Sequence, residues 1–455
     1  MIGPPEHLVA VRLPLDSGPP IDPYALAGPT GAVFRTRDRV LVGLGSALVI
    51  PLPHGLGSPA DVREVAQTLE ALECGDRCGA LAGSSPVIAF GSLPFDRSEP
   101  SSLVVPRIVY GAESSGPEWV TVFSNDRAEL PTESAGLRAW LLARTTIGRS
   151  GLGARETSDV TPALRILPRS SDRAFEAMVT EAVTAIRRGE LDKVVLARQV
   201  DVSMPESIDI AALLRRWHRL EPDCAVFSMP TADGQFVGAS PELLVDRVGR
   251  RVQSRPLAGT TDRFSADDGV LPRELLASRK DGNEHRLVVE AIAEALTPLC
   301  SELDVPTQPD LVHLHTITHL GSSLTGTLEP RSDGAIPTAL DLVALLHPTP
   351  AVGGVPSEEA LDLISRLEPQ PRGHYAGPVG YVDSRGDGRW MIGIRALSIR
   401  DRRARLAAGV GVVAGSQPST ELAETSLKLA AAFDALAPGV PFTTHERPSA
   451  REPVS

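Results

Sequence analysis

The sequence predicts an α+β fold. Short apolar runs typical of strands recur along the 455-residue chain, separated by turn residues, and longer stretches with helical spacing interrupt them. The regular alternation of strand and helix that would indicate a parallel α/β sheet is missing, and no short internal repeat is present. With 42% hydrophobic residues, the chain can form a large buried core.

Composition and charge narrow the classes of partner. The net charge of -12 argues against a nucleic-acid partner, which would need a basic stripe, although a few local cations can still hold a small acidic ligand. The N-terminal segment "MIGPPEHLVAVRLPLDSGPP" lacks a basic region followed by an apolar one, and no run of about eighteen apolar residues occurs. We therefore expect a cytoplasmic protein that binds no membrane. The four cysteines lack the spacing of a zinc site.

The first part of the chain is rich in Pro and Gly up to about residue 165, and runs such as "RVLVGLGSALVIPL" predict short strands joined by loops. No catalytic set of residues is apparent there. A helix follows, because Ser171 or Asp172 can cap it, its apolar residues recur at helical spacing, and Gly189 can end it. The stretch "DKVVLARQV" then predicts a buried strand headed by Lys193.

The remaining elements follow in order. Strands are predicted for "AVFSMP", "GQFVGAS", "ELLVDRV" and "RRVQSRPLAGT", and a helix for "EHRLVVEAIAEAL". The helical stretches "ALDLVALL" and "SEEALDLISRLE" precede two further strands, "RWMIGIRALSI" and "RARLAAGVGVV", and "TELAETSLKLAAAFDAL" closes the fold as a helix. Residues 438–455 are predicted to be a disordered tail.

Lys193 is unusual because it stands at the head of an apolar strand. On a strand it shares one face with Val195 and Ala197, where desolvation favours the neutral amine and would make it a usable base. From this segment alone, a strand-end lysine that extends its ammonium to water is the alternative.

Several acidic residues are candidates for chemistry. Glu242 lies in "GASPELL", a turn between two apolar strands, where burial could hold its carboxyl protonated; a plain turn residue is the alternative. Glu284 opens a helix and points along its apolar face, although dipole pairing would also explain an acid there. In the last helix Glu421, Glu424 and Lys428 share one face, which is equally typical of a solvated face with a Glu424–Lys428 pair.

Two patterns point to other functions. "GVGVVAG" has the wrong spacing for a dinucleotide-binding loop and follows a strand without the βαβ context, so nicotinamide binding is not predicted. "HLHTITHL" carries His313, His315 and His319, which would share one face of a strand, but no HExxH-type base accompanies them. A zinc hydrolase built on these histidines and a non-catalytic ligand-binding protein are the rival hypotheses.

The order of eight segments favours a third hypothesis. "KVVLARQV", "GASPELL", "SRPLAGTTDR", "SRKDGNEHRLVVE", "LHPTPAVGG", "RGHYAGPVGYVD", "IGIRALSI" and "ELAETSLKL" together resemble the chorismate-utilising enzymes, and within that family the isochorismate synthases. The resemblance covers about residues 170–436. It implies a layered α/β/β/α sandwich with large, mainly antiparallel sheets, a variable N-terminal lobe over residues 1–165, and a chorismate-binding catalytic region over 166–437.

The resemblance also implies roles for individual residues. The general base falls on Lys193 and the general acid on Glu242. The Mg²⁺ ligands fall on Glu284 and Glu424, with Glu421 beside the metal. The positions that hold the carboxylates of the substrate or line its pocket are Arg395, Gly409, Lys428, His319, Tyr375 and Ala351.

The implied reaction starts with water, which Lys193 activates for addition at C2 of chorismate, while the C4 hydroxyl leaves with a proton from Glu242. Relatives that add ammonia commonly have glutamine at this lysine position, and those that use a covalent lysine have it where Ala258 stands here. Ala351 matches a site that is usually threonine in enzymes that go on to expel pyruvate. "HLGSSLTG" nevertheless looks a little like the salicylate branch, so salicylate synthase is the alternative.

Cofactor and partners follow from the same resemblance. It implies Mg²⁺ as the cofactor, chorismate as a small-molecule substrate, no amidotransferase subunit, and a monomer. "RGHYAGPVGYVD" looks more like members of the menaquinone pathway than of the siderophore pathway, and both pathways stay open.

Overall fold

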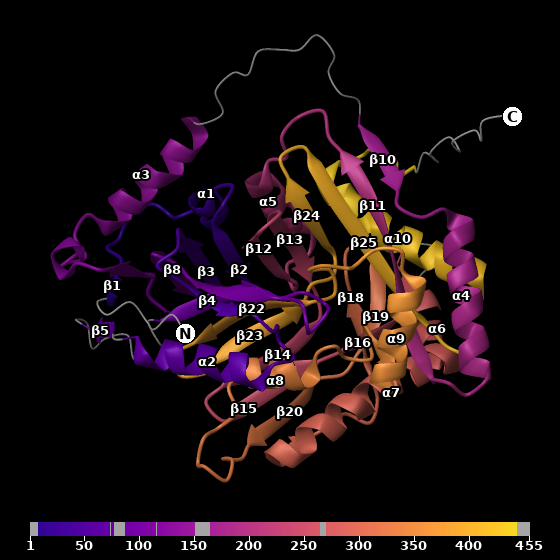
Figure 1. Cartoon of the computed structure of the whole chain (residues 1–455). Helices are drawn as coiled ribbons and strands as arrows, with labels where there is room; N and C mark the ends of the chain where they lie inside the picture. The colour runs from indigo at the N-terminus through magenta and orange to yellow at the C-terminus, as the bar shows by residue number, and fades with distance from the viewer. Residues whose placement is uncertain are drawn as a thin grey trace, which may run out of the picture.

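The computed structural model describes residues 8–72, 74–76, 87–114, 116–150, 164–263 and 270–443. Three sheets form its framework (Figure 1). The largest, in spatial order, contains β10 (Arg165–Pro168), β11 (Lys193–Ser203), β25 (Arg403–Val412), β24 (Ala396–Arg400), β13 (Gly234–Ser240), β12 (Ala225–Thr231), β2 (Ala32–Arg35), β3 (Arg39–Leu44), β8 (Ile108–Glu113), β9 (Trp119–Ser124), β1 (Val9–Pro14) and β5 (Cys74–Asp76), with β21 (Gly354–Val355) beside β11.

The second and third sheets are smaller. The nine-stranded sheet contains β17 (Cys300–Asp304), β20 (Leu324–Leu328), β15 (Arg251–Arg255), β14 (Leu243–Val248), β23 (Gly388–Ile392), β22 (Pro378–Asp383), β6 (Ile88–Ser92), β7 (Ser101–Val105) and β4 (Leu48–Leu52). The three-stranded sheet contains β16 (Leu257–Asp262), β19 (Ile317–Gly321) and β18 (Asp310–His313). Pairing is antiparallel except between β1 and β5.

The central strands of the largest sheet are buried on both faces. Because successive side chains on a strand point to opposite faces, neighbours such as Val33 and Phe34, or Val226 and Phe227, belong to two different core clusters. One cluster fills the space between the two large sheets. The other lies under helices α1 (Pro23–Ala27), α5 (Ile210–Leu220) and α10 (Pro418–Leu436).

Helices α2 (Pro59–Ala71) and α8 (Ala339–Leu346) cover the outer face of the nine-stranded sheet, as Figure 1 shows. Helices, sheet, sheet and helices therefore stack as the predicted layers, and the α+β prediction is confirmed. None of the helices in the described part of the chain has both the length and the apolar character needed to span a bilayer.

The segment around Lys193 folds as predicted. Helix α4 (Asp172–Arg187) has Ser171 as its N-cap, whose side chain accepts a hydrogen bond from the Ala174 N–H, and Gly189 follows with φ 76°. Strand β11 then begins at Lys193. The capping residue, the helical spacing of the apolar residues and the terminating glycine were enough to predict this segment, because each acts through residues that are close in sequence.

Three sequence expectations were wrong in detail. "RRVQSRPLAGT" forms two strands in different sheets, β15 and β16, because Pro256 interrupts the pairing. "RWMIGIRALSI" likewise divides into β23 and β24. "HLHTITHL" is a hairpin of β18 and β19 with His315 in its turn, so the three histidines do not share one strand face.

Helix α7 (Arg279–Leu296) also begins earlier than expected. Ser278 is its N-cap, and its side chain accepts a hydrogen bond from the Asp281 N–H. Glu284 therefore lies in the second turn and does not open the helix, and dipole pairing no longer explains its position.

The predicted boundary at residue 165 stays a prediction. Strands from the first part of the chain extend both large sheets, so the two parts share a framework. Of the predicted tail, residues 444–455 lie outside the described part. Phe442, before them, packs its ring 5.4 Å from that of Phe433.

Candidate active site

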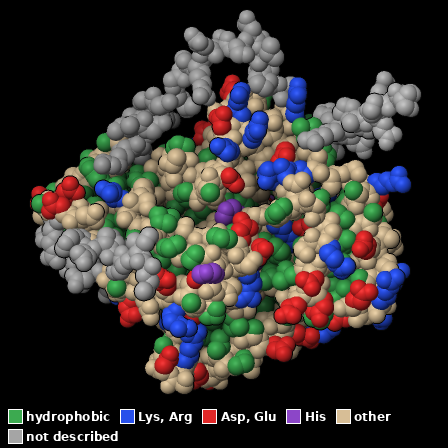
Figure 2. Space-filling model, in the orientation of Figure 1, with side chains coloured by type: hydrophobic (Ala, Val, Ile, Leu, Met, Phe, Trp, Pro, Cys, Tyr) green, Lys and Arg blue, Asp and Glu red, His purple; other side chains and the backbone are tan. Residues whose placement is uncertain are grey.

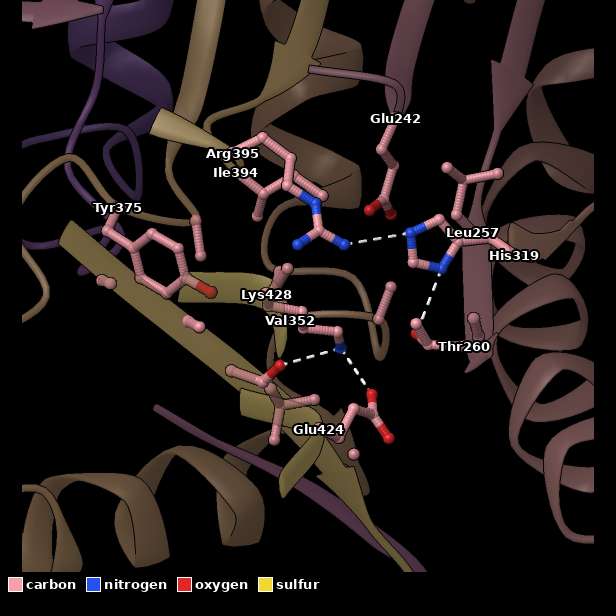
Figure 3. Close-up of a pocket in the computed structure, with 18 of the residues that line it drawn as sticks. Glu242, Leu257, Thr260, His319, Val352, Tyr375, Ile394, Arg395, Glu424 and Lys428 are labelled. Atoms are coloured by element: carbon pink, nitrogen blue, oxygen red, sulfur yellow. Dashed lines mark hydrogen bonds and ion pairs between the residues drawn. The ribbon is translucent and has the colours of Figure 1, made fainter. Parts of the chain in front are cut away.

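A pocket with an empty volume of about 720 Å³, part of it open to solvent, lies where the odd-numbered face of β11 and β25 meets the three-stranded sheet. Its walls come from β11, β16, α7, β19, β25, α10 and the loops before β22 and β24. Figure 3 shows the side chains of Glu242, Arg395 and Lys428 directed into it. All its lining residues come from the part of the chain after residue 165.

Glycines open the floor of the pocket. On β25, Gly409 and Gly411 point to the same face as Val195 of β11, and Ala197 and Val195 are their partners across the ladder. A Cβ atom at Gly411 would collide with the carboxylate of Glu284 and lie 3.1 Å from Lys193 Cε. The "GVGVVAG" motif thus leaves space for charged side chains beneath the pocket, a role that its spacing alone did not indicate.

A cluster of three lysine–glutamate pairs lies at one end of the pocket; we call it the Lys–Glu cluster. Its members are Lys193 with Glu284, Lys280 with Glu421, and Lys428 with Glu424, and the N–O distances within these pairs are 3.0 Å, 2.6 Å and 2.6 Å. Glu284, Glu424 and Lys428 line the pocket, whereas the other three members lie behind its wall.

Lys193 is fully buried, as is Glu421 of the same cluster. Its Nζ atom is in ion-pair contact with Glu284 Oε1 but lacks a hydrogen bond with good geometry in the described structure. Burial on its own would raise the pKa of Glu284, but the charges of Lys193, Lys428 and Lys280 together outweigh it, and the pKa lies below its usual value. Glu284 is therefore an ionised carboxylate.

Glu242 is in the opposite electrostatic state. It lies between β13 and β14, is 3% exposed, and faces the pocket. Burial raises the pKa of its carboxyl to about 8, although the Leu257 N–H and the charges of Lys193 and Lys428 partly oppose the shift. The sequence prediction of a carboxyl kept protonated by burial agrees with this environment.

Arg395 supplies a half-buried cation without an acidic partner at ion-pair distance among the described residues. It follows β23 and precedes β24, at the point where the chain passes from one large sheet to the other, and its φ of 52° is uncommon for a residue with a side chain. Its Nη2 lies 3.1 Å from His319 Nε2, and its Nε is buried without a partner. A guanidinium in this state is suited to binding a carboxylate.

His319 keeps one tautomer. Its Nδ1 lies 3.0 Å from the Gly259 carbonyl oxygen, which can only accept a hydrogen bond, so Nδ1 carries the proton and Nε2 accepts from Arg395. Burial, with the nearby charge of Arg395, holds the pKa of His319 well below its usual value. A neutral His319 therefore orients the guanidinium (Figure 3).

The remaining predicted residues line the pocket as well. Tyr375 places its hydroxyl beside Gly409, and burial raises its pKa to about 12, so the hydroxyl stays protonated. The Lys428 ammonium donates to the Gly409 carbonyl oxygen at 3.0 Å. Ala351 lies in the loop after α8 and presents only a methyl group.

Sequence reasoning missed two residues at this site. Arg372 is buried, lines the pocket, and donates to the carbonyl oxygens of Val195 and Val352 while it pairs with Glu368. Lys280 pairs with the fully buried Glu421. The motif "SRKDGNEH" contained Lys280, but nothing in its spacing separated it from a surface residue.

The residues of the Lys–Glu cluster fit a magnesium ion by their chemistry. Hard carboxylate oxygens are the protein ligands that Mg²⁺ prefers, and Glu421 Oε2 is buried with no hydrogen-bond partner, which leaves an acceptor unused. Within the described ranges, no three acidic, histidine or cysteine side chains are already placed around one point. The lysines hold the carboxylates, so a bound ion would have to replace at least one ion pair.

The family follows from the sequence as a whole. Residues 35–437 match the family described as chorismate binding enzymes. The chain belongs to this family. Arg395 and the Lys–Glu cluster are the charged features at the pocket of this family member.

Relatives from bacteria resemble the chain over most of its length. The isochorismate synthase DhbC of Bacillus subtilis is 35% identical, and the match covers 88% of this chain and 92% of DhbC. Among solved structures, the Bacillus anthracis protein assigned as a 2,3-dihydroxybenzoate-specific isochorismate synthase is 32% identical with a TM-score of 0.71, covering 90% and 96% of the two chains. The menaquinone-specific isochorismate synthase MenF of Escherichia coli is 25% identical with a TM-score of 0.72, covering 95% of each.

Proposed function

We propose that the chain is an isochorismate synthase, an isomerase that converts chorismate to isochorismate. The observation that carries this proposal is Glu242, a buried carboxyl with a raised pKa at the wall of a pocket that also contains the unpaired guanidinium of Arg395. An acid that stays protonated near neutral pH is what the departure of a hydroxyl group requires. The relatives named above, which carry out this reaction by name, support the same activity.

The chemistry uses one base and one acid. Lys193 acts as the base: once its ammonium has given its proton to solvent, the amine takes a proton from water, whose oxygen forms a bond to C2 of the ring. The ring double bond shifts, the C4–O bond breaks, and the departing hydroxyl takes the proton of Glu242 and leaves as water. One water molecule enters and one leaves, so the product is an isomer, and solvent returns the proton from Lys193 to Glu242.

Binding uses the cationic groups. Arg395, held by His319, and the Lys428 ammonium beside the Gly409 carbonyl oxygen are the candidates for the two carboxylates of chorismate. Tyr375 and Ala351 shape the ring site. Glu284 and Glu424, with Glu421 beside them, would hold Mg²⁺, which when bound neutralises carboxylate charge in the pocket.

Ala351 favours an enzyme that stops at isochorismate, because a methyl group offers no hydroxyl beside the substrate. The pathway is not decided by the relatives, since one is menaquinone-specific and another 2,3-dihydroxybenzoate-specific. On the face shown in Figure 2, Lys and Arg side chains lie interspersed with acidic ones, consistent with a small-molecule substrate. We further propose a monomer without an amidotransferase subunit, in the cytoplasm.

The test is to incubate the purified chain with chorismate and Mg²⁺ in ¹⁸O-labelled water and to resolve the products by chromatography and mass spectrometry. Isochorismate carrying one ¹⁸O atom, formed without ammonium, is the expected product. Unlabelled isochorismate would contradict water addition. Salicylate with pyruvate would move the chain to the salicylate branch, an amino product would overturn the role of Lys193, and no turnover would refute the proposal.

The metal assignment has its own test. Turnover should stop with EDTA and return with Mg²⁺, and Glu424→Ala should remove this dependence together with most of the activity, because a ligand is lost. Exposed Glu290→Ala, on α7 outside the pocket, is the control. Turnover indifferent to EDTA, or stoichiometric zinc that survives dialysis, would contradict a magnesium site.

A further inference from the structure

Lysine is almost absent from this chain. Of its 45 Lys and Arg residues only three are lysines, Lys193, Lys280 and Lys428, and the remaining basic side chains of this type are arginine. All three belong to the Lys–Glu cluster, where each pairs with a different glutamate. A composition that uses arginine everywhere else indicates that these three positions need the properties of an amine.

Two of these lysines already have a role in the proposed function. Lys193 is the base, and Lys428 lines the pocket as a seat for a carboxylate. Lys280 has neither role, because it does not line the pocket and lies on the first turn of α7 with a side chain that is 33% exposed. Its partner Glu421 is 0% exposed. The mobile end of this pair is therefore the lysine.

Charge balance explains what the Lys280 ammonium does. The Lys–Glu cluster and the neighbouring Asp281 together contain four carboxyl groups and three ammonium groups. Their formal charges sum to one negative charge. In the ion-paired state without substrate, where all three amines are protonated, a dication added to this set would leave one net positive charge in a largely buried site. The same dication, with the Lys280 ammonium moved into solvent, leaves the set neutral, which is the least costly state at low dielectric.

An arginine would suit this exchange poorly. Its guanidinium binds a carboxylate through two parallel hydrogen bonds and holds the partner firmly, whereas an ammonium is a compact charge on a flexible stem. Glu421 uses only Oε1 for Lys280, at 2.6 Å, and its Oε2 is buried without a partner. The ion pair can therefore be broken by a movement of the partly exposed Lys280 side chain.

We propose that Lys280 is a displaceable counter-ion, which occupies Glu421 while the site has no metal and leaves for solvent when Mg²⁺ binds. The inference rests on the proposed function, because it takes Glu421 to lie beside the metal. Its consequence is a low intrinsic affinity for Mg²⁺, since each binding event must first break the Lys280–Glu421 pair.

Metal binding without substrate measures this competition. We expect Lys280→Met, which keeps the length of the side chain and removes its charge, to bind Mg²⁺ about tenfold more tightly by calorimetry, and Lys280→Arg to bind no more tightly than the unmodified chain. Arg286→Met, on the same helix with its own exposed ion pair to Glu290, is the matched control and should not change the affinity. Unchanged or weaker binding by Lys280→Met would overturn the proposal.

Chemical labelling gives a second readout that needs no variant. An amine-specific acetylating reagent, followed by peptide mass spectrometry, reports each lysine separately, and Lys193 at 0% exposure serves as the unreactive reference. Mg²⁺ should increase the labelling rate of Lys280 several-fold because its ammonium leaves the ion pair. A rate that Mg²⁺ leaves unchanged or lowers would contradict displacement.

The magnesium assignment and the counter-ion proposal can be refuted separately. If the unmodified chain binds no Mg²⁺ and its turnover ignores EDTA, the metal assignment itself is wrong, and the counter-ion proposal is refuted with it. If the chain binds Mg²⁺ at a site lost in Glu424→Ala, while Lys280→Met leaves the affinity unchanged, the counter-ion proposal alone is refuted.

Discussion

Glu242 and Glu284 line the same pocket and are both largely buried, yet their carboxyl groups are in opposite charge states. Among the described residues, no cation lies at ion-pair distance from Glu242, so burial dominates and raises its pKa to about 8. Glu284 has Lys193 at 3.0 Å, and its pKa falls below the usual value. The nearest partner, more than the depth of burial, decides which carboxyl is an acid and which is a charge.

The largest effect is expected at Lys193, the ion-pair partner of Glu284. Lys193→Gln should abolish isochorismate formation, and it should also lower the free energy of unfolding by about 3 kcal/mol, because it leaves the Glu284 carboxylate buried without a partner. Activity assays and urea unfolding measure the two losses.

A double variant sharpens this point. Lys193→Gln combined with Glu284→Gln removes both charges and should recover most of the lost stability without recovering activity. Equal instability of the single and double variants would show that the ion pair does not account for the effect.

The next largest effect is expected at Glu242. Glu242→Gln should lower kcat by about 10²–10⁴-fold, because it removes the proton donor. The free energy of unfolding at pH 7 should change little or increase. An amide has nearly the shape of a protonated carboxyl and needs no charge stabilisation. Activity retained within about threefold would contradict the acid assignment.

The pH dependence of stability has a defined sign for Glu242. Its folded pKa of about 8 lies above the ordinary value of 4.5, so the carboxyl favours the folded state fully below about pH 4.5, and this contribution is lost as pH rises to about 8. The unmodified chain should therefore lose stability relative to Glu242→Gln between these values, by up to about 1.4 kcal/mol per pH unit. A difference that does not vary with pH would place the pKa of Glu242 near its ordinary value.

The smallest effect is expected at Ala351, which is neither charged nor part of an ion pair. Ala351→Thr should keep most of the isochorismate activity and add a minor yield of salicylate and pyruvate, because a hydroxyl then lies beside the bound ring. Ala351→Val, which has the same shape without the hydroxyl, is the control. Salicylate from both variants would attribute the effect to size instead of the hydroxyl.

Local signals in the sequence predicted the elements that local interactions determine. The Ser171 cap, the stripe of α4 and the Lys193 strand were found because each depends on neighbours within one or two turns. The transition at Arg395 was not, since strand alternation does not show that β23 and β24 belong to different sheets. Apolar periodicity carries no information about long-range partners.

The chemistry of the site shows the same division. Residue types and the family resemblance pointed to Lys193, Glu242 and Arg395. In the structure, Glu242 and Arg395 line one pocket, and Lys193 pairs with Glu284 in its wall. They could not show that Lys280 pairs with Glu421, because residues 141 positions apart meet only in the folded chain. Even so, the scarcity of lysine was visible in the sequence and would have drawn attention to Lys280.

Infrared difference spectroscopy tests the contrast between the two carboxyl groups most directly. The carbonyl band of a protonated carboxyl should be present at pH 7 in the unmodified chain, vanish in Glu242→Gln, and titrate away near pH 8. Glu284→Gln should leave that band in place, because its carboxyl is ionised throughout. Loss of the band in Glu284→Gln, or its absence from the unmodified chain at pH 7, would contradict the assignment of acid and charge to these two residues.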